Sequence, residues 1–247
     1  MTVFVTPAHD CPGLTASQMV KVDRVAVAHY RLGLVQMMEN AGRNLARLAR
    51  AQFLNGDPRG RQVTVLAGSG GNGGGVLVAA RHLHNWGAQI EVILSQAGRA
   101  IKAVPRNQLT ILRRMGVSVR CKEVPPITHR PDLLIDGLIG YSLRGAPTGA
   151  AADLIRWANH SGAPILSMDV PSGLDATTGA VAVPTIRAAA TLALALPKTG
   201  LQAESASAHV GDLYLADIGI PPLVYKRLNL KLQIDSLFAQ SEIIRVR

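Results

Sequence analysis

Cysteine and aromatic residues are scarce in this sequence of 247 residues, and long apolar runs are missing. Its two cysteines, Cys11 and Cys121, are too few for a disulfide framework or a four-ligand zinc site. No apolar run approaches the roughly 18 residues that a membrane span requires. The opening segment, MTVFVTPAHDCPGL, has neither the basic start nor the apolar core of a secretory signal. We therefore expect a cytoplasmic protein that crosses no membrane.

The chain is basic, because 26 lysine and arginine residues outnumber 16 aspartate and glutamate residues and give a formal net charge of +10. Aromatic residues make up only 4% of the chain, and the basic residues form no dense tract. Few stacking side chains disfavour binding of single-stranded nucleic acid, so we do not expect nucleic acid as a partner. The excess charge instead indicates solubility and attraction for a small anionic ligand.

Two helical stretches open the chain, over residues 17–33 and 35–54. After them, short apolar runs alternate with helical stretches, which is the pattern of a mostly parallel sheet with helices on both faces. We predict one α/β domain over residues 1–247, with a core of about 14–222, the N-terminal helices packed on it, and a tail, 223–247, without assigned structure. The predicted strands are 63–67, 90–94, 117–119, 133–136, 165–169, 188–196 and 213–216, and the predicted helices between them are 76–86, 107–115 and 151–160.

A glycine cluster at residues 68–75 lies directly between a predicted strand and a predicted helix. Glycine has no Cβ atom, so backbone amides can approach a phosphate closely here, and the start of the following helix adds partial positive charge. No lysine follows at the spacing of a P-loop, which excludes that motif. Two other interpretations stay open: an ordinary Rossmann coenzyme site with Glu91 as its acidic residue, and a tight turn without a ligand.

Two predicted strands end in an aspartate, Asp136 and Asp169, and each runs into a glycine-containing loop. Ligands of open parallel sheets bind beyond the carboxyl ends of the strands, where the glycine cluster also opens, so we expect these elements at one rim. Asn72, Asp136 and Ser172 offer only hard oxygen ligands, which suit a hard cation rather than zinc or copper. The alternative role for each aspartate is a helix cap or a loop brace.

Lys198 follows a strand-like run, in the segment Leu196-Pro197-Lys198-Thr199-Gly200. From this position its ammonium group can reach the same rim and meet a phosphate group. The alternative is an exposed surface lysine.

Five sets of segments follow one another along the chain, between about Leu14 and Pro222. They are LTASQMVKVDR with MMENAG (14–24 and 37–42), GNGGGVLVAARHL (71–83), IDGLIGYSLRG (135–145), MDVPSGLDATTG (168–179) and Pro197-Lys198. Together they resemble the NAD(P)HX epimerases, also called the YjeF N-terminal domain family. Each segment alone is a weak signal, whereas five in the family's order form a strong one, so the chain is identified as a stand-alone member.

The resemblance implies a Rossmann-like three-layer α/β/α sandwich that epimerises the R and S forms of hydrated NADH and NADPH, a metabolite-repair reaction. Asp169 would contact the hydrated nicotinamide, and we predict that it is the catalytic acid/base. A potassium ion would sit on Asn72, Asp136 and Ser172, in agreement with their hard oxygen atoms. The substrate-binding residues would be Gly71, Asn72, Gly73, Gly74 and Gly75 in a first loop, Gly140, Tyr141, Ser142, Leu143, Arg144, Gly145 and Ala146 in a second loop, and Asp169, with Lys198 added for its position.

The chain departs from the family pattern at Gly71 and Gly75, where the family typically has an asparagine and an aspartate. Backbone amides still suffice for phosphate, but the lost carboxylate bears on catalysis and cation geometry. The alternative function is therefore a non-catalytic nucleotide-ligand-binding or scaffold member of the family. Many members carry a C-terminal dehydratase domain, which for this chain would be a separate partner. Met37, Met38 and Leu45 predict a homodimer, unless they pack on the chain's own sheet.

Overall fold

The sheet of this protein is seen in a computed structural model that describes residues 4–6, 11–126, 128–230, 232, 234 and 236–247. Its strands are β1 (Gln62–Ala67), β2 (Gln89–Leu94), β3 (Ser118–Cys121), β4 (Leu133–Gly137), β5 (Ile165–Met168), β6 (Ala190–Leu194), β7 (Asp212–Ala216) and β8 (Ile243–Arg245). They form one sheet in the order β3-β2-β1-β4-β5-β6-β7-β8. Neighbouring strands run parallel except β7 and β8, which pair antiparallel.

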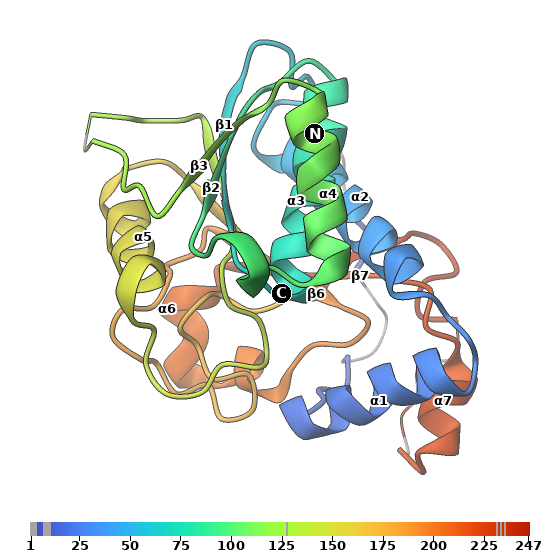
Figure 1. Ribbon diagram of the computed structural model, residues 1–247. Coiled ribbons are helices and arrows are strands. Elements are labelled where there is room, and N and C mark those ends of the chain that lie inside the picture. The colour runs from blue at the N-terminus through green and yellow to red at the C-terminus, as the bar shows by residue number, and fades with distance from the viewer. Residues whose placement is uncertain (1–3, 7–10, 127, 231, 233, 235) are drawn as a thin grey trace.

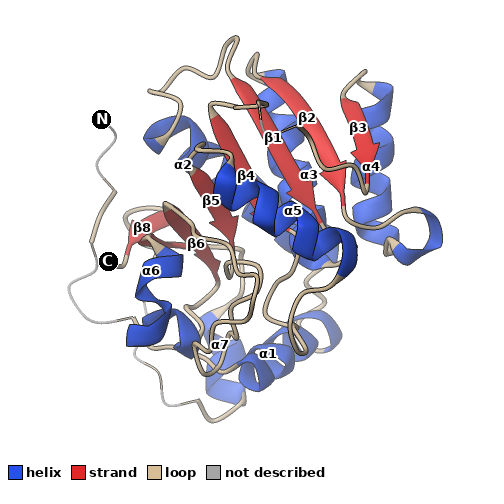
Figure 2. Ribbon diagram, turned by 90° about the vertical axis from the view of Figure 1, so that its left-hand side faces the viewer, coloured by secondary structure: helices blue, strands red, loops and turns tan. Residues whose placement is uncertain are grey.

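Helices cover both faces of this sheet. They are α1 (Ala16–Ala28), α2 (Leu34–Gln52), α3 (Gly71–Asn85), α4 (Ala103–Arg114), α5 (Gly149–His160), α6 (Ser207–Val210) and α7 (Pro222–Arg227), with short 3-10 turns at Gly98–Ala100, Thr199–Gln202 and Glu204–Ala206. α2, α3 and α4 lie on one face, and α5 and α6 lie on the other (Figure 1). α1 and α7 contact each other beyond the carboxyl ends of the strands (Figure 2). The predicted fold, a Rossmann-like α/β/α sandwich with N-terminal helices packed on it, is confirmed.

The sequence explains how these layers form. Every residue of β4 and β5 is buried, which requires cover on both faces of the sheet. α1 begins at a capping box, in which Gln18 N donates to Thr15 Oγ1 at 3.2 Å and Thr15 N donates to Gln18 Oε1 at 2.8 Å. α2 is amphipathic, with Leu45 and Leu48 buried and Arg43 exposed. Local sequence signals and burial therefore agree in these elements.

The helix after the glycine cluster begins at Gly71, earlier than the predicted start at Val76. Its first turn is already closed, because Gly74 N donates to Gly70 O at 3.1 Å. A Cβ atom on Gly73 would overlap a backbone carbonyl, so only glycine allows the close approach of α3 to its neighbours. The sequence predicts the start of α3 too late because glycine has a low helix propensity. Tertiary packing overrides that propensity here.

Three further regions differ from the sequence predictions. The strand expected over 188–196 is confined to β6, and the tail that had no assigned structure contains α7 and the edge strand β8. Met37 and Leu45 are buried within the chain and Met38 lines a cleft, so these side chains pack on their own chain and do not support a homodimer. Among the described residues, no helix has both the length and the apolar character to cross a membrane.

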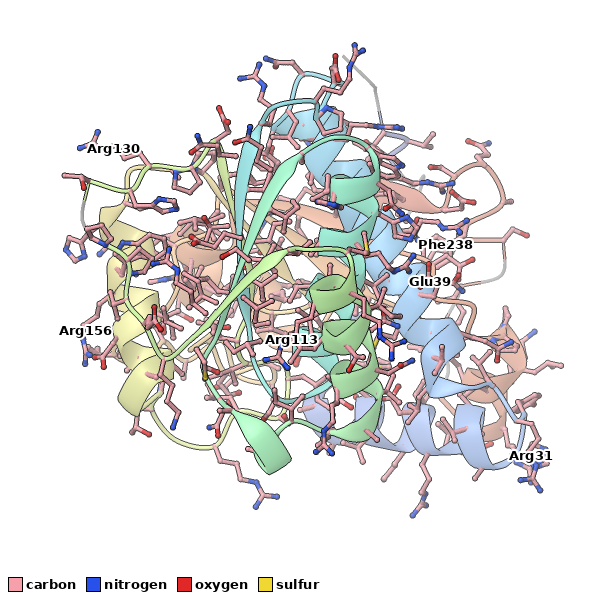
Figure 3. All side chains as sticks on the ribbon, turned by 45° about the horizontal axis from the view of Figure 1, so that its top comes forward. Arg31, Glu39, Arg113, Arg130, Arg156 and Phe238 are labelled. Carbon is pink, nitrogen blue, oxygen red and sulfur yellow. The ribbon has the colours of Figure 1, made fainter. Side chains whose placement is uncertain are left out.

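Exposed arginine residues lie on several elements of the molecule. Figure 3 shows Arg31, Arg113, Arg130 and Arg156 on different parts of the surface. Arg156 is paired with Asp153 at 2.8 Å on α5, as one of several exposed ion pairs. These four arginines do not form a single basic stripe of the kind that is typical of nucleic-acid-binding domains.

The contact between α2 and α3 generates a first prediction. A Cβ atom on Gly42 would lie 2.5 Å from Gly75 O and 2.6 Å from Val78 Cγ1. We expect Gly42→Ala to lower the free energy of unfolding by about 1–3 kcal/mol, because the methyl group overpacks the helix contact. Urea unfolding measures this change, with Gly71→Ala as the control, since nothing lies within 4 Å of a Cβ atom there. Equal effects of the two substitutions would contradict the close contact.

Candidate active site

A cleft of about 610 Å³ opens at the carboxyl ends of β1, β4 and β5. It lies at the point where the order of the strands reverses, because β1 pairs with β2 on one side and with β4 on the other. Ligands of such sheets bind at this switch point. The walls come from α1, the first half of α2, the start of α3 and the loops that follow β2, β4, β5 and β6.

The start of α3 forms the floor of one half of the cleft. Gly71 and Gly73 line it, and Gly71 is exposed with open space around its Cα atom. The first turn of α3 contains no acidic residue, so unpaired backbone amides and the helix dipole favour an anion there. Gly74 instead faces α2 and α4, where a Cβ atom would lie 2.5 Å from Met38 Sδ and 3.1 Å from Pro105 Cγ.

Asn72 links the start of α3 to the other side of the cleft. Its Nδ2 atom donates to Met168 O at 2.7 Å, at the end of β5. Its Oδ1 atom lies beside the loop after β4, only 2.5 Å from where a Cβ atom on Gly140 would be. Glycine at position 140 therefore makes the room in which the amide of Asn72 sits.

Asp136 is a buried carboxylate at the end of β4, with 1% of its surface exposed. Oδ1 accepts from Ser172 Oγ at 2.6 Å and Leu138 N at 3.2 Å, and Oδ2 accepts from Ser172 N and Ser167 Oγ, each at 2.9 Å. Burial raises the pKa of Asp136, and these hydrogen bonds oppose the rise. The structure thus brings Asp136 and Ser172 into direct contact.

Asp169 follows β5 and forms a buried ion pair with Lys198. Its backbone has a φ of +67°, a left-handed conformation that aspartate tolerates better than most residues. Lys198 is only 1% exposed, and its Nζ atom also donates to Leu194 O at 3.0 Å and Leu196 O at 3.3 Å. Lys198 is therefore not the exposed lysine that the sequence allowed as an alternative. Its donors are directed at Asp169 and backbone carbonyls, and its contact with the substrate stays a prediction.

A second carboxylate in the cleft, Asp23 on α1, was not singled out from the sequence. Tyr141 Oη donates to Asp23 Oδ2 at 2.6 Å. Burial raises the pKa of Asp23, while the hydrogen bond from Tyr141 and the charge of Lys198 lower it and Asp169 raises it further. The one sequence feature that points to Asp23 is its place in the segment 14–24, which is part of the family resemblance. The resemblance itself implies no role for this residue.

Most residues that the sequence proposed for the substrate do line this cleft. The exceptions are Gly74, which is packed between helices, and Gly145, which is an exposed turn residue with a φ of +69°. Asp136 and Ser172, proposed for the cation, lie buried behind the lining. The lining residues proposed beforehand are Gly71, Asn72, Gly73, Gly75, Gly140, Tyr141, Ser142, Leu143, Arg144, Ala146, Asp169 and Lys198, and those missed include Asp23, Met38, Ser95, Gln96 and Lys102.

The arrangement combines an anion-binding helix start with two carboxylates in one cleft. Such a site can hold a phosphorylated ligand at one end and move protons at the other. Within the described residues, no group of three or more His, Cys, Asp or Glu side chains is placed to hold a metal ion. A cation at this site would therefore rest on mixed oxygen ligands such as amide, hydroxyl and carboxylate groups.

The buried ion pair generates a second prediction. We expect Lys198→Met to lower the free energy of unfolding by about 3–5 kcal/mol, because it leaves the carboxylate of Asp169 buried without its partner. Lys102→Met, which removes an exposed lysine of the same cleft, is the control and should change it by less than about 0.5 kcal/mol. The loss in the double variant with Asp169→Asn should be smaller than the sum of the single losses. Additive losses would show that the two side chains do not act as a pair.

Comparison with known proteins places this cleft in a family. The family model described as YjeF-related protein N-terminus matches residues 34–200. A Dehalogenimonas lykanthroporepellens protein named NAD(P)H-hydrate epimerase is 46% identical over 218 residues, which cover 88% of this chain and 86% of the relative. A Truepera radiovictrix protein of the same name is 34% identical, over 88% of this chain and 94% of the relative. A Moorella thermoacetica protein named bifunctional NAD(P)H-hydrate repair enzyme is 34% identical, over 84% of this chain but only 40% of the relative.

The fold has a close counterpart among solved structures. The crystal structure of the yeast protein ynu0 gives a TM-score of 0.80 and covers 95% of this chain and 99% of that chain, at 23% sequence identity. This likeness supports the fold, while the family model and the bacterial relatives match most of the sequence. The chain therefore belongs to the family of YjeF-related protein N-terminal domains.

Proposed function

We propose that this protein is an NAD(P)H-hydrate epimerase, which interconverts the R and S forms of hydrated NADH and NADPH. The Dehalogenimonas and Truepera relatives carry this name and match the chain over most of both lengths. The observation that supports the proposal in this chain is the carboxylate of Asp169, paired with Lys198 in a cleft that also contains the glycine-rich start of α3. This cleft supplies both requirements of the reaction, a diphosphate site and an acid/base group.

The negative charge of the substrate's diphosphate decides its orientation in the cleft. Its diphosphate binds at the start of α3, where Gly71 and Asn72 present a helix N-terminus without acidic side chains. In sheets with this strand order the two halves of a dinucleotide lie on either side of the switch point. The hydrated ring therefore lies on the β5 side, near Asp169, with Tyr141 and the 140–146 loop as its other wall.

Epimerisation inverts the ring carbon that carries the hydroxyl group beside the ring nitrogen. The nitrogen lone pair expels this hydroxyl as water once an acid supplies a proton, which leaves a carbon–nitrogen double bond. Water then adds to the opposite face and loses a proton to a base, so nothing is consumed. Asp169 serves as acid/base, with Oδ1 held by Lys198 Nζ and by Leu194 N, the latter at 3.2 Å.

A potassium ion is the proposed cofactor, held by Asn72, Asp136 and Ser172. Their amide, carboxylate and hydroxyl oxygens fit a hard monovalent cation. The carboxylate of Asp136 is buried among neutral donors from Leu138, Ser167 and Ser172, so a cation would supply the charge compensation that these groups lack. When bound, the ion would stabilise the ionised carboxylate and the two loops beside it.

The proposed partners follow from the same repair reaction. The bifunctional relatives combine two repair activities, and this chain spans about 40% of the Moorella protein. We propose a dehydratase as the partner enzyme that uses the same metabolite. The proposed homodimer would rely on three apolar side chains of α1 and α2 that are 51–54% exposed, Val20, Leu34 and Val35.

The role of Asp169 generates a third prediction. We expect Asp169→Asn to lower kcat for S/R exchange by at least about 10²-fold, because the amide cannot exchange the proton. Affinity for NADPH should stay close to that of the unmodified protein, since the diphosphate binds at α3. Chromatographic separation of the two epimers measures exchange, and calorimetry measures binding.

Asp153→Asn is the matched control, because it removes an exposed carboxylate on α5 and should leave exchange unchanged. Near-normal exchange in Asp169→Asn would refute its role. Tight NADPH binding without exchange in the unmodified protein would instead favour the alternative, a non-catalytic nucleotide-ligand-binding or scaffold member of the family.

The potassium site generates a fourth prediction. We expect potassium chloride to raise the melting temperature more than choline chloride at equal ionic strength, because only potassium can bind among the oxygens of Asn72, Asp136 and Ser172. Asn72→Ala should remove the difference between the salts, while Asn159→Ala, on α5, should keep it. Equal melting temperatures in both salts would reject the proposed cofactor.

A further inference from the structure

Asp23 is a carboxylate of the cleft that has no part in the proton transfer assigned to Asp169. It projects from α1 into the cleft, where Tyr141 Oη donates to its Oδ2 atom at 2.6 Å. These two residues come from parts of the chain 118 positions apart, and both line the same cleft as Asp169. The pair therefore belongs to the site and is not a surface contact.

Tyr141 lies between the two carboxylates of the cleft. Its hydroxyl bonds to Asp23, and the ammonium group of Lys198 lies 5.8 Å from the centre of its ring. Lys198 in turn pairs with Asp169. The cleft thus holds one carboxylate in an ion pair and a second carboxylate whose hydrogen-bond partner is a neutral phenol.

We infer that Asp23, acting with Tyr141, is a second acid/base group of this cleft, which protonates the leaving hydroxyl while Asp169 takes a proton from the incoming water. The inference rests on the proposed function. In one turnover the O–H bond of Asp23 breaks, the carbon–oxygen bond of the substrate breaks, and water departs. A new carbon–oxygen bond then forms on the other face, and the released proton ends on Asp169. The reverse turnover, with the roles exchanged, restores both groups.

Two groups suit an inversion better than one. The hydroxyl leaves from one face of the ring and water arrives at the other, so a single carboxylate would have to serve both faces. Asp169 is paired with a cation, Lys198, whereas Asp23 accepts a hydrogen bond from a neutral phenol. Burial raises the pKa of Asp23 and favours its protonated form. When two carboxylates lie in such different environments, one typically acts as the acid and the other as the base.

The charged and titratable groups around Asp23 set the direction of its pH dependence. Tyr141, Lys198 and Asp169 face it from the loops, and Tyr225 faces it from α7. Burial and the charge of Asp23 both raise the pKa of Tyr225, and they raise that of Tyr141, so both phenols stay neutral. Asp23 must be protonated to act as the acid, so kcat falls as the pH rises through its raised pKa.

The test compares Asp23→Asn with Tyr141→Phe in the S/R exchange assay across pH. We expect Asp23→Asn to lower kcat by about 10²-fold or more and to remove the fall of kcat at higher pH, with affinity for NADPH kept within about twofold. Tyr141→Phe keeps the carboxyl group but removes a hydrogen bond that lowers the pKa of Asp23. In this variant the fall of kcat should therefore move to higher pH.

Tyr30→Phe, at the end of α1, is the matched control and should leave kcat and the pH profile unchanged. Unchanged kcat and pH profile in Asp23→Asn would overturn the inference. The same holds if both variants lose only affinity for NADPH, because the hydrogen bond would then merely anchor the 140–146 loop. If Asp23→Asn does not fold, the shift in Tyr141→Phe decides. A complete lack of exchange in the unmodified protein would overturn the proposed function instead.

Discussion

One buried carboxylate holds the candidate site together. Asp136 accepts hydrogen bonds from Leu138 N, from Ser167 Oγ and from both the backbone and the side chain of Ser172. Ser172 Oγ also accepts a hydrogen bond from Ile139 N at 2.8 Å. The loops after β4 and β5 are therefore connected by hydrogen bonds to Asp136 and Ser172. Burying a carboxylate with fewer hydrogen-bond donors would lower the stability of the fold. The hydrogen bonds that Asp136 accepts also fix the two loops that carry most of the site.

The cleft built on this frame separates two electrostatic regions. At the start of α3 there are backbone amides and no acidic side chain, which suits a diphosphate. Toward β5 and α1 there are the carboxylates of Asp169 and Asp23, the first neutralised by Lys198 and the second bonded to Tyr141. A ligand with an anionic middle and a neutral, hydrated ring matches this division, because its charge stays away from the carboxylates.

The sequence predicts those parts of the site that local signals determine. Asp136 and Asp169 are found because each ends an apolar strand, and the topology of parallel sheets then brings them to one edge. The sequence predicts Lys198 near the site but not its ion pair, because its burial depends on Asp169, which lies 29 positions away in the chain. Asp23 is missed for the same reason, as only the folded chain brings α1 to Tyr141. The early start of α3 is missed because packing at Gly73 outweighs the low helix propensity of glycine.

The family resemblance implies an aspartate at position 75, and the glycine found there has a structural counterpart in this chain. A Cβ atom on Gly75 would lie 2.6 Å from Met168 Sδ, so the methionine side chain occupies the space that a longer residue would need. The start of α3 consequently keeps its positive potential without a competing carboxylate, which favours binding of a diphosphate. Neither Asp169 nor Asp23 is touched by this change, so the groups assigned to proton transfer remain in the cleft. The altered glycine segment is therefore compatible with turnover as well as with binding.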